Sequence, residues 1–217
     1  MTMSTISQSS SPDAYDDAPL PRFASRGRAF VYIAPCRDDN VFKVGFSRNP
    51  LERFRTLHAR FFDFFDLEQG VLVATDRVRD ARRLERRLIT ALADYQALAP
   101  LVVPTSAAGH TEWFRGALDD ALAIADGFET SEGFAIHRPA SAWFRQVLRE
   151  RADLLFAWSA RMLEAIEYET HNGAAPDSAR AYEASLRHTL DAYAAFAIEL
   201  PPLLPAQVTR WYAALEK

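Results

Sequence analysis

Apolar and polar positions alternate in blocks between residues 30 and 58, and this pattern predicts a strand, a turn, a second strand and a helix. The first apolar run surrounds Tyr32, and the polar stretch 37–40 separates it from a second run at 41–46. An Asn-Pro pair then supplies a cap and a first helical residue, after which apolar residues recur at helical spacing. Two strands this short, joined by a short polar link, favour an antiparallel hairpin.

The apolar pattern continues to about residue 127 and predicts further elements around the same sheet. Four of the five residues in 61–65 are phenylalanine, which is more typical of core than of a base-stacking surface. The run 71–74 lies between turn residues and predicts a third strand. A helix is expected over 78–95, with its apolar stripe facing the sheet. Another helix is expected from Thr111, as a candidate N-cap, to residue 127.

The second half of the chain has the periodicity of helices throughout. Helices are expected over 141–170, 177–199 and 206–216, and no motif stands out among them. By default such a region is a packing unit or a surface through which copies of the chain associate. The N-terminal segment is rich in Ser, Pro and Asp without periodicity, which is typical of disorder.

These patterns predict an α+β protein. Its small three-stranded antiparallel-type sheet is flanked by helices in the order β-β-α-β-α, and an all-α C-terminal region follows. The expected divisions are a disordered segment 1–25, an α+β domain 26–127 and a helical region 128–217.

Composition narrows the protein class without fixing the function. The chain has 217 residues, 49% of them hydrophobic, which is ample for a packed core. It shows neither an apolar run of about 20 residues nor the features of a signal peptide, so a cytoplasmic protein with no membrane association is expected. The single cysteine, Cys36, excludes an internal disulfide and a zinc site built from several thiolates.

Charge is distributed unevenly along the chain. The net charge is −4, but residues 26–126 hold 15 basic and 14 acidic side chains. Within this segment six arginines fall between residues 77 and 87, against only Asp80 and Glu85. This helix surface is either an ordinary solvated face or a contact surface for a phosphate backbone. Any contact with nucleic acid must therefore come from a local patch.

Three polar side chains of the hairpin and helix are candidates for anion binding, namely Tyr32, Lys43 and Arg53. Together with later residues they form an ordered set of motifs: Val31-Tyr32-Ile33, Lys43-Val44-Gly45, Glu85-Arg86-Arg87-Leu88 and Glu112-Trp113-Phe114. In this set, roughly residues 28–126, the chain resembles the GIY-YIG nuclease superfamily. The similarity is to a phage-related and bacterial branch whose second motif begins with lysine in place of tyrosine.

The resemblance implies an endonuclease that hydrolyses phosphodiester bonds of nucleic acid with one Mg²⁺ or Mn²⁺ ion. By this analogy Glu85 holds the metal, Arg53 binds the phosphate and Tyr32 orients or deprotonates the attacking water. Lys43 completes the site, although a protonated lysine donates without accepting and is a poor base unless burial lowers its pKa. His58 follows Arg53 by five positions and is a further candidate.

Other residues are given weaker roles. The side chains expected to contact nucleic acid are Arg48, Arg55, Arg79, Arg82, Arg83 and Arg86. Gly45, Glu112 and Trp113 belong either to the site or to the framework. DNA is the first choice of partner, though nothing in the residues separates it from RNA.

Two alternatives remain open. One is a module that binds nucleic acid on the same fold without cutting it. The other is a protein that acts through its C-terminal helices on a protein partner or on a second copy of itself.

Overall fold

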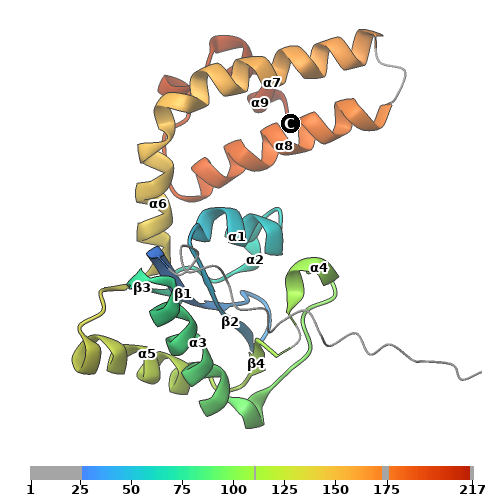
Figure 1. The fold of residues 1–217 in the computed structure, drawn as a ribbon. Helices are drawn as coiled ribbons and strands as arrows, with labels where there is room; N and C mark the ends of the chain where they lie inside the picture. Colours follow the sequence, from blue (N-terminus) through green and yellow to red (C-terminus); the bar gives the residue numbers. More distant parts are fainter. Residues whose placement is uncertain (1–25, 110, 173–175, 216–217) are drawn as a thin grey trace, which may run out of the picture.

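The protein is described here from a computed structural model, which describes residues 26–109, 111–172 and 176–215 (Figure 1). The expected disordered segment 1–25 lies outside the described residues. Five antiparallel strands form one sheet in the order β4-β2-β1-β3-β5. They are β1 (Arg26–Pro35), β2 (Val41–Ser47), β3 (Val71–Arg77), β4 (Trp113–Arg115) and β5 (Ile136–His137).

The predicted hairpin and third strand are confirmed, but the prediction of only three strands is wrong. The segment after Thr111 begins as β4, in which Trp113 and Phe114 pair with Lys43 and Phe42 on β2. Both aromatic side chains are fully buried on opposite faces of the sheet, and this burial outweighs the capping signal at Thr111. β5 is only two residues long and pairs with β3, so it leaves no readable alternation in the sequence.

The sheet has an apolar core on each face, because successive side chains of β1 point to opposite sides. Val31 and Ile33 lie in the core beneath α3 (Val78–Ala91) and α5 (Leu118–Glu132). Phe30 and Tyr32 lie in the other core, which also contains residues of α1 (Pro50–Leu57) and α2 (Phe61–Phe64). The predicted stripe of α3 is buried at its centre, whereas the helix ends at residue 91 and is followed by a short 3-10 turn, η2 (Ala93–Tyr95).

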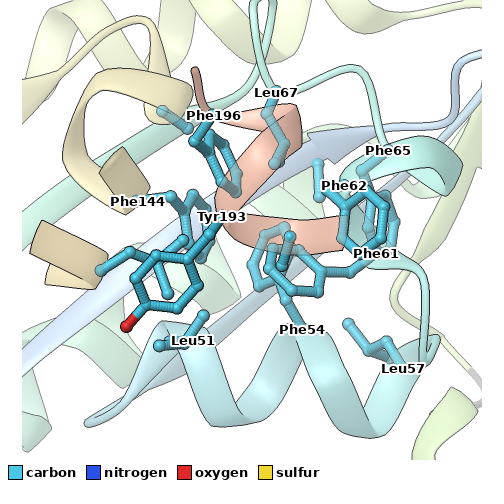
Figure 2. Close-up of a cluster of buried hydrophobic side chains, with 14 of the residues drawn as sticks. Leu51, Phe54, Leu57, Phe61, Phe62, Phe65, Leu67, Phe144, Tyr193 and Phe196 are labelled. Atoms are coloured by element: carbon cyan, nitrogen blue, oxygen red, sulfur yellow. The ribbon is translucent and has the colours of Figure 1, made fainter. Parts of the chain in front are cut away.

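The aromatic run 61–65 is confirmed as core. Phe54 of α1 lies among these aromatic side chains, and its ring centroid is 5.1 Å from that of Phe65 and 5.0 Å from that of Phe144 (Figure 2). Phe196, more than 130 positions after Phe61, packs against the same cluster. The N-terminal sheet and the C-terminal helices therefore share one continuous core.

The C-terminal region is helical as expected, but its boundaries differ. The predicted helix 141–170 is divided at Arg151 into α6 (Ala140–Glu150) and α7 (Ala152–Asn172). α8 (Pro176–Ala195) runs back along α7, and the pair lies beyond α1 and α2 in Figure 1. η3 (Pro201–Leu203) and α9 (Ala206–Ala214) end the described chain. The expected division after residue 127 falls inside α5.

The described helices were also compared with the length and apolarity that a bilayer requires. None of those within the described ranges is both long and apolar enough to cross a membrane.

Candidate functional site

Tyr32 and Arg53 meet on the face of the sheet that α1 covers. Tyr32 lies at the middle of β1, where its ring packs edge-on against Phe54 at 5.2 Å between centroids. The Nε atom of Arg53 donates to the Tyr32 hydroxyl at 3.2 Å. Burial raises the pKa of Tyr32 to about 12, although the neighbouring guanidinium of Arg53 acts in the opposite direction. The phenol is therefore neutral at physiological pH.

Gly45 provides the space in which the Tyr32 ring lies. The two residues are direct partners across β1 and β2. A β-carbon on Gly45 would lie only 2.4 Å from the Tyr32 hydroxyl oxygen. The absence of a side chain here is therefore required by the close approach of the ring to the backbone of β2.

Lys43 is a fully buried charged residue on the same face of β2. Its Nζ atom donates to Oε2 of Glu112 at 2.6 Å and lies 5.2 Å from the centre of the Trp113 ring. Burial lowers the pKa of Lys43, whereas the Glu112 carboxylate opposes this shift. Glu112 is 28% exposed, so the ion pair reaches solvent only from the glutamate side.

Glu85 reaches the same region from α3, on the other face of the sheet. β4 begins opposite Lys43, so the end of β2 from residue 44 onward has no strand partner on that side. There the Phe46 backbone N–H donates to the Glu85 carboxylate, and the Val44 N–H donates to the Glu112 carbonyl oxygen at 2.9 Å. Glu85 thus lies at an open sheet edge.

The environment of Glu85 disfavours its charged form. Burial is the main cause and the neighbouring Glu112 carboxylate the second, and together they raise the pKa of Glu85 to about 7. Lys43 and Arg82 act against the shift. A carboxyl group with this pKa exchanges protons near neutral pH and would gain from a nearby cation.

The sequence-predicted set Tyr32, Lys43, Arg53 and Glu85 is therefore close enough in space for mutual electrostatic effects. The charge of Arg53 lowers the pKa of both Tyr32 and Lys43, and the charge of Glu85 raises both. Glu112, which sequence reasoning left between site and framework, contacts Lys43 directly. The arrangement gathers two cations, two carboxyl groups and a phenol around the end of β2.

A segment between η2 and β4 covers this cluster. It contains α4 (Thr105–Ala108), and we call residues 104–109 the α4 strap. The Ala107 carbonyl oxygen accepts from Arg53 at 3.0 Å. A β-carbon on Gly109, whose φ is +68°, would lie 2.5 Å from Glu112 Oε2. The strap thus closes over Arg53 and the Lys43–Glu112 pair.

The arginines of α3 separate into two groups. Arg83 and Arg87 both pair with Glu132 of α5, and Arg87 lies over the Phe128 ring. Arg82 is exposed and lies 5.4 Å from the centre of the Phe46 ring, beside the open sheet edge. Arg79 and Arg86 are also exposed. The group closest to Glu85 is therefore Arg82 with its helical neighbours at 79 and 86.

Two other predicted residues, His58 and Arg55, lie away from this cluster. His58 caps the end of α1, its Nδ1 accepts from the Arg60 N–H at 3.2 Å, and its ring stacks on Phe64. His58 is the C-cap residue and has extended backbone, so its side chain no longer follows the helical spacing from Arg53. Arg55 faces the C-terminal helices, and Arg48 is exposed just after β2.

The carboxyl groups at the β2 end were considered as metal ligands. Within the described parts of the chain, no group of three or more His, Cys, Asp or Glu side chains is arranged to hold a metal ion. The Glu112 carboxylate is near enough to raise the pKa of Glu85, and it is itself paired with Lys43. Carboxylate oxygens belong to the ligand types that Mg²⁺ uses, together with water and substrate phosphates. The metal ion therefore stays a prediction from the sequence.

A known protein family matches the N-terminal half of the chain. Residues 29–129 match the T5orf172 domain. The matched segment is just under half of the chain and extends from β1 into α5. The T5orf172 family is nuclease-like and is distinct from GIY-YIG, although both are related to nuclease-like phage proteins. No curated protein and no solved structure matches the chain.

The resemblance to the GIY-YIG superfamily is therefore wrong, because the family match is to the T5orf172 domain. The motifs that suggested it have local structural causes. Gly45 is required by the Tyr32 ring, and Trp113 and Phe114 are buried strand residues. Packing demands of a hairpin and its neighbouring strand thus account for part of the pattern.

Two features of the site escaped sequence reasoning. The first is the Lys43–Glu112 pair, which joins residues 69 positions apart and which β4 pairing brings together. The second is the α4 strap, whose four-residue helix has too few positions to show periodicity. For the pair, one signal was present, since a lone lysine in an apolar run of a strand requires an anionic partner.

Proposed function

We propose that the protein is a metal-dependent endonuclease that hydrolyses phosphodiester bonds of DNA at the end of β2. The match to a nuclease-like domain is consistent with a nucleic-acid-related function. The observation that carries the finer proposal is the position of Glu85. A carboxyl group with a pKa of about 7 lies at an open sheet edge beside the cations Lys43 and Arg82.

In this proposal Glu85 holds one Mg²⁺ or Mn²⁺ ion, with Glu112 next to it. When bound, a divalent ion neutralises phosphate charge and lowers the pKa of a water molecule. The Arg53 guanidinium binds non-bridging oxygens of the phosphate, a task that suits its permanent charge and planar fork of donors. The exposed group at Arg79, Arg82 and Arg86 contacts the flanking backbone.

Hydrolysis forms a bond from water oxygen to phosphorus and breaks the bond to the leaving sugar oxygen. Tyr32 orients groups in the site and does not act as the base. With a pKa of about 12 its phenol stays protonated, so it does not accept the proton of water. Lys43 stays paired with Glu112. The attacking water releases its proton to solvent as the bond to phosphorus forms, and the leaving sugar oxygen takes up a proton from solvent.

The α4 strap sets the condition for substrate entry. Arg53 donates to the Ala107 carbonyl oxygen, and a phosphate oxygen would have to take the place of that acceptor. Lys43 is 0% exposed beneath the same segment. In this proposal the strap moves aside when DNA binds, as in other enzymes with loops that cover the site.

Incubation of plasmid DNA with the purified protein, with and without Mg²⁺ or Mn²⁺, tests the proposal. The Glu85→Gln and Arg53→Gln variants are expected to lower the cleavage rate at least 100-fold, on the order expected for lost transition-state stabilisation. Matched controls are Glu129→Gln on α5 and Arg161→Gln on α7, both exposed and distant from β2. Single-stranded DNA and RNA in parallel arms identify the preferred nucleic acid. Cleavage that persists unchanged in both site variants would refute the proposal.

A second candidate function is DNA binding without cleavage. It is favoured by the burial of Lys43 beneath the α4 strap and by the high pKa of Tyr32, which together leave the site short of a base. Salt-sensitive binding that depends on Arg82 and Arg86, with no cleavage at any metal concentration, would support this candidate.

A further inference from the structure

A cavity of about 300 Å³ lies where α1 meets the C-terminal helices, away from the end of β2. Leu51 and Leu155 contribute apolar lining, and Trp158 of α7 forms part of its wall. Its volume is at the lower end of the range for small-ligand sites, which are typically apolar with a few placed polar groups. The cavity has this composition, because two arginines and three hydroxyl groups also line it.

The two arginines, Arg55 of α1 and Arg151 between α6 and α7, share one weak partner. Each has its NH1 atom 3.7 Å from the same Oε1 atom of Glu52, which is beyond hydrogen-bond distance. Glu52 is 54% exposed, so water screens its charge. Two guanidinium groups therefore stand close together with only one partly screened carboxylate, and a single anion can reach both.

The hydroxyl of Tyr193 belongs to the same site. Its ring is buried against the aromatic cluster, and Figure 2 shows its oxygen directed away from Phe54 and Phe61. Burial raises the pKa of this phenol, and the charges of Arg55 and Arg151 oppose the rise, which is consistent with an oxygen near both arginines. Ser185 and Thr189 of α8 add two hydroxyl groups to the lining.

We infer that this cavity binds a small aromatic phosphate of mononucleotide size, with the phosphate on Arg55 and Arg151 and the ring against Trp158. A phosphate dianion suits two guanidinium groups, because it carries two charges and its several oxygens can accept from both groups at once. The ring and leucine side chains suit a flat apolar body. The inference is independent of the proposed nuclease activity. Such a phosphate can come from a free nucleotide or from the 5′ end of a strand.

Calorimetric titration of the full chain with AMP tests the inference, with adenosine and inorganic phosphate as separate probes. AMP is expected to bind with a Kd below about 1 mM, and each fragment at least ten times more weakly. Arg151→Gln should weaken AMP binding at least tenfold, and Arg55→Gln is the second variant if that one folds poorly. Arg161→Gln, exposed on the same helix as Trp158, is the control that should bind normally.

Further arms decide the chemistry and the source. AMP should change tryptophan emission in the natural chain but not in Trp158→Phe. Competition between AMP and a 5′-phosphorylated dinucleotide identifies a strand end as a ligand, whereas AMP binding without such competition identifies a free nucleotide. Three results would overturn the inference: no AMP binding, AMP binding that is unchanged in both arginine variants, or tighter binding of 2-naphthoate, an aromatic carboxylate without phosphate, than of AMP.

Discussion

Replacing Gly45 by alanine is the most direct test of the geometry around Tyr32. The new β-carbon would lie 2.4 Å from the Tyr32 hydroxyl oxygen and 2.5 Å from the ring carbon that bears it, whereas ordinary contact begins near 3.4 Å. The ring must therefore move by about 1 Å. It is only 1% exposed and packs on Phe54, so the movement is resisted on all sides.

The expected cost follows from two terms. Overpacking of a tight core costs about 1–3 kcal/mol, and displacement of the phenol weakens the hydrogen bond from Arg53, whose contribution is about 1.5–3 kcal/mol when intact. A gain of about 0.5–1 kcal/mol from reduced freedom of the unfolded chain offsets part of this loss. The net loss is about 2–3 kcal/mol, which lowers Tm by about 4–12 °C in a chain of this size.

Urea unfolding followed by tryptophan fluorescence measures the difference. Gly127→Ala is the matched control, because a β-carbon there meets nothing within 4 Å inside α5 and should stabilise the helix by about 0.5–1 kcal/mol. A Gly45→Ala variant as stable as the natural chain to within about 0.5 kcal/mol would show that the Tyr32 ring does not lie across Gly45.

Four other perturbations give separate outcomes. Glu112→Gln removes the carboxylate that pairs with the buried Lys43 and should lower the free energy of unfolding by about 1–3 kcal/mol at pH 7. Because burial lowers the pKa of Lys43, this loss should shrink as the pH rises into the alkaline range, and a loss of constant size in urea unfolding would contradict the prediction. The fold raises the pKa of Glu85 from 4.5 to about 7, so the protonated form of Glu85 stabilises the protein below pH 4.5, and this stability is lost as the pH rises through 7. The free energy of unfolding of Glu85→Gln should therefore equal that of the natural chain at pH 4 and exceed it by about 1–3 kcal/mol at pH 8. Millimolar Mg²⁺ should raise the Tm of the natural chain but not of Glu85→Gln, and an equal rise in both would remove Glu85 as the metal ligand. Glu132→Gln should release Arg83 and Arg87, and the slope of log K against log salt for DNA binding should steepen by up to about two units. The free energy of unfolding should fall by at most about 1 kcal/mol. An unchanged slope in binding titrations would show that these arginines do not reach the DNA backbone.

The local parts of the fold were predictable because their signals lie within short windows. The cap at Asn49 is observed, with its side chain accepting from the Glu52 N–H at 3.4 Å, and the apolar stripe of α1 is buried as its spacing indicates. The aromatic run was likewise correctly assigned to the core. In each case the residues that decide the outcome are within about one or two helical turns of one another.

Long-range pairing was less accessible to sequence reasoning. β4 depends on the match of Trp113 with Lys43, and β5 on two residues that gain their conformation only from β3. The grouping of Tyr32, Lys43, Arg53 and Glu85 was inferred through a family resemblance that the comparison corrects, so their roles remain proposals. The sharing of Glu132 by two arginines left no mark in the local pattern.

The aromatic core described in Figure 2 has a consequence for the timing of biosynthesis, since it needs both ends of the described chain. Phe61 leaves the ribosome 135 residues before Phe196, which packs against it. At a rate of about 5–20 residues per second, the aromatic side chains of α1 and α2 that the C-terminal helices cover stay exposed for about 7–27 s. A nascent chain stopped before α8 would leave these aromatic side chains exposed to chaperones and to other chains. The C-terminal helices are therefore needed to complete the core of the N-terminal half.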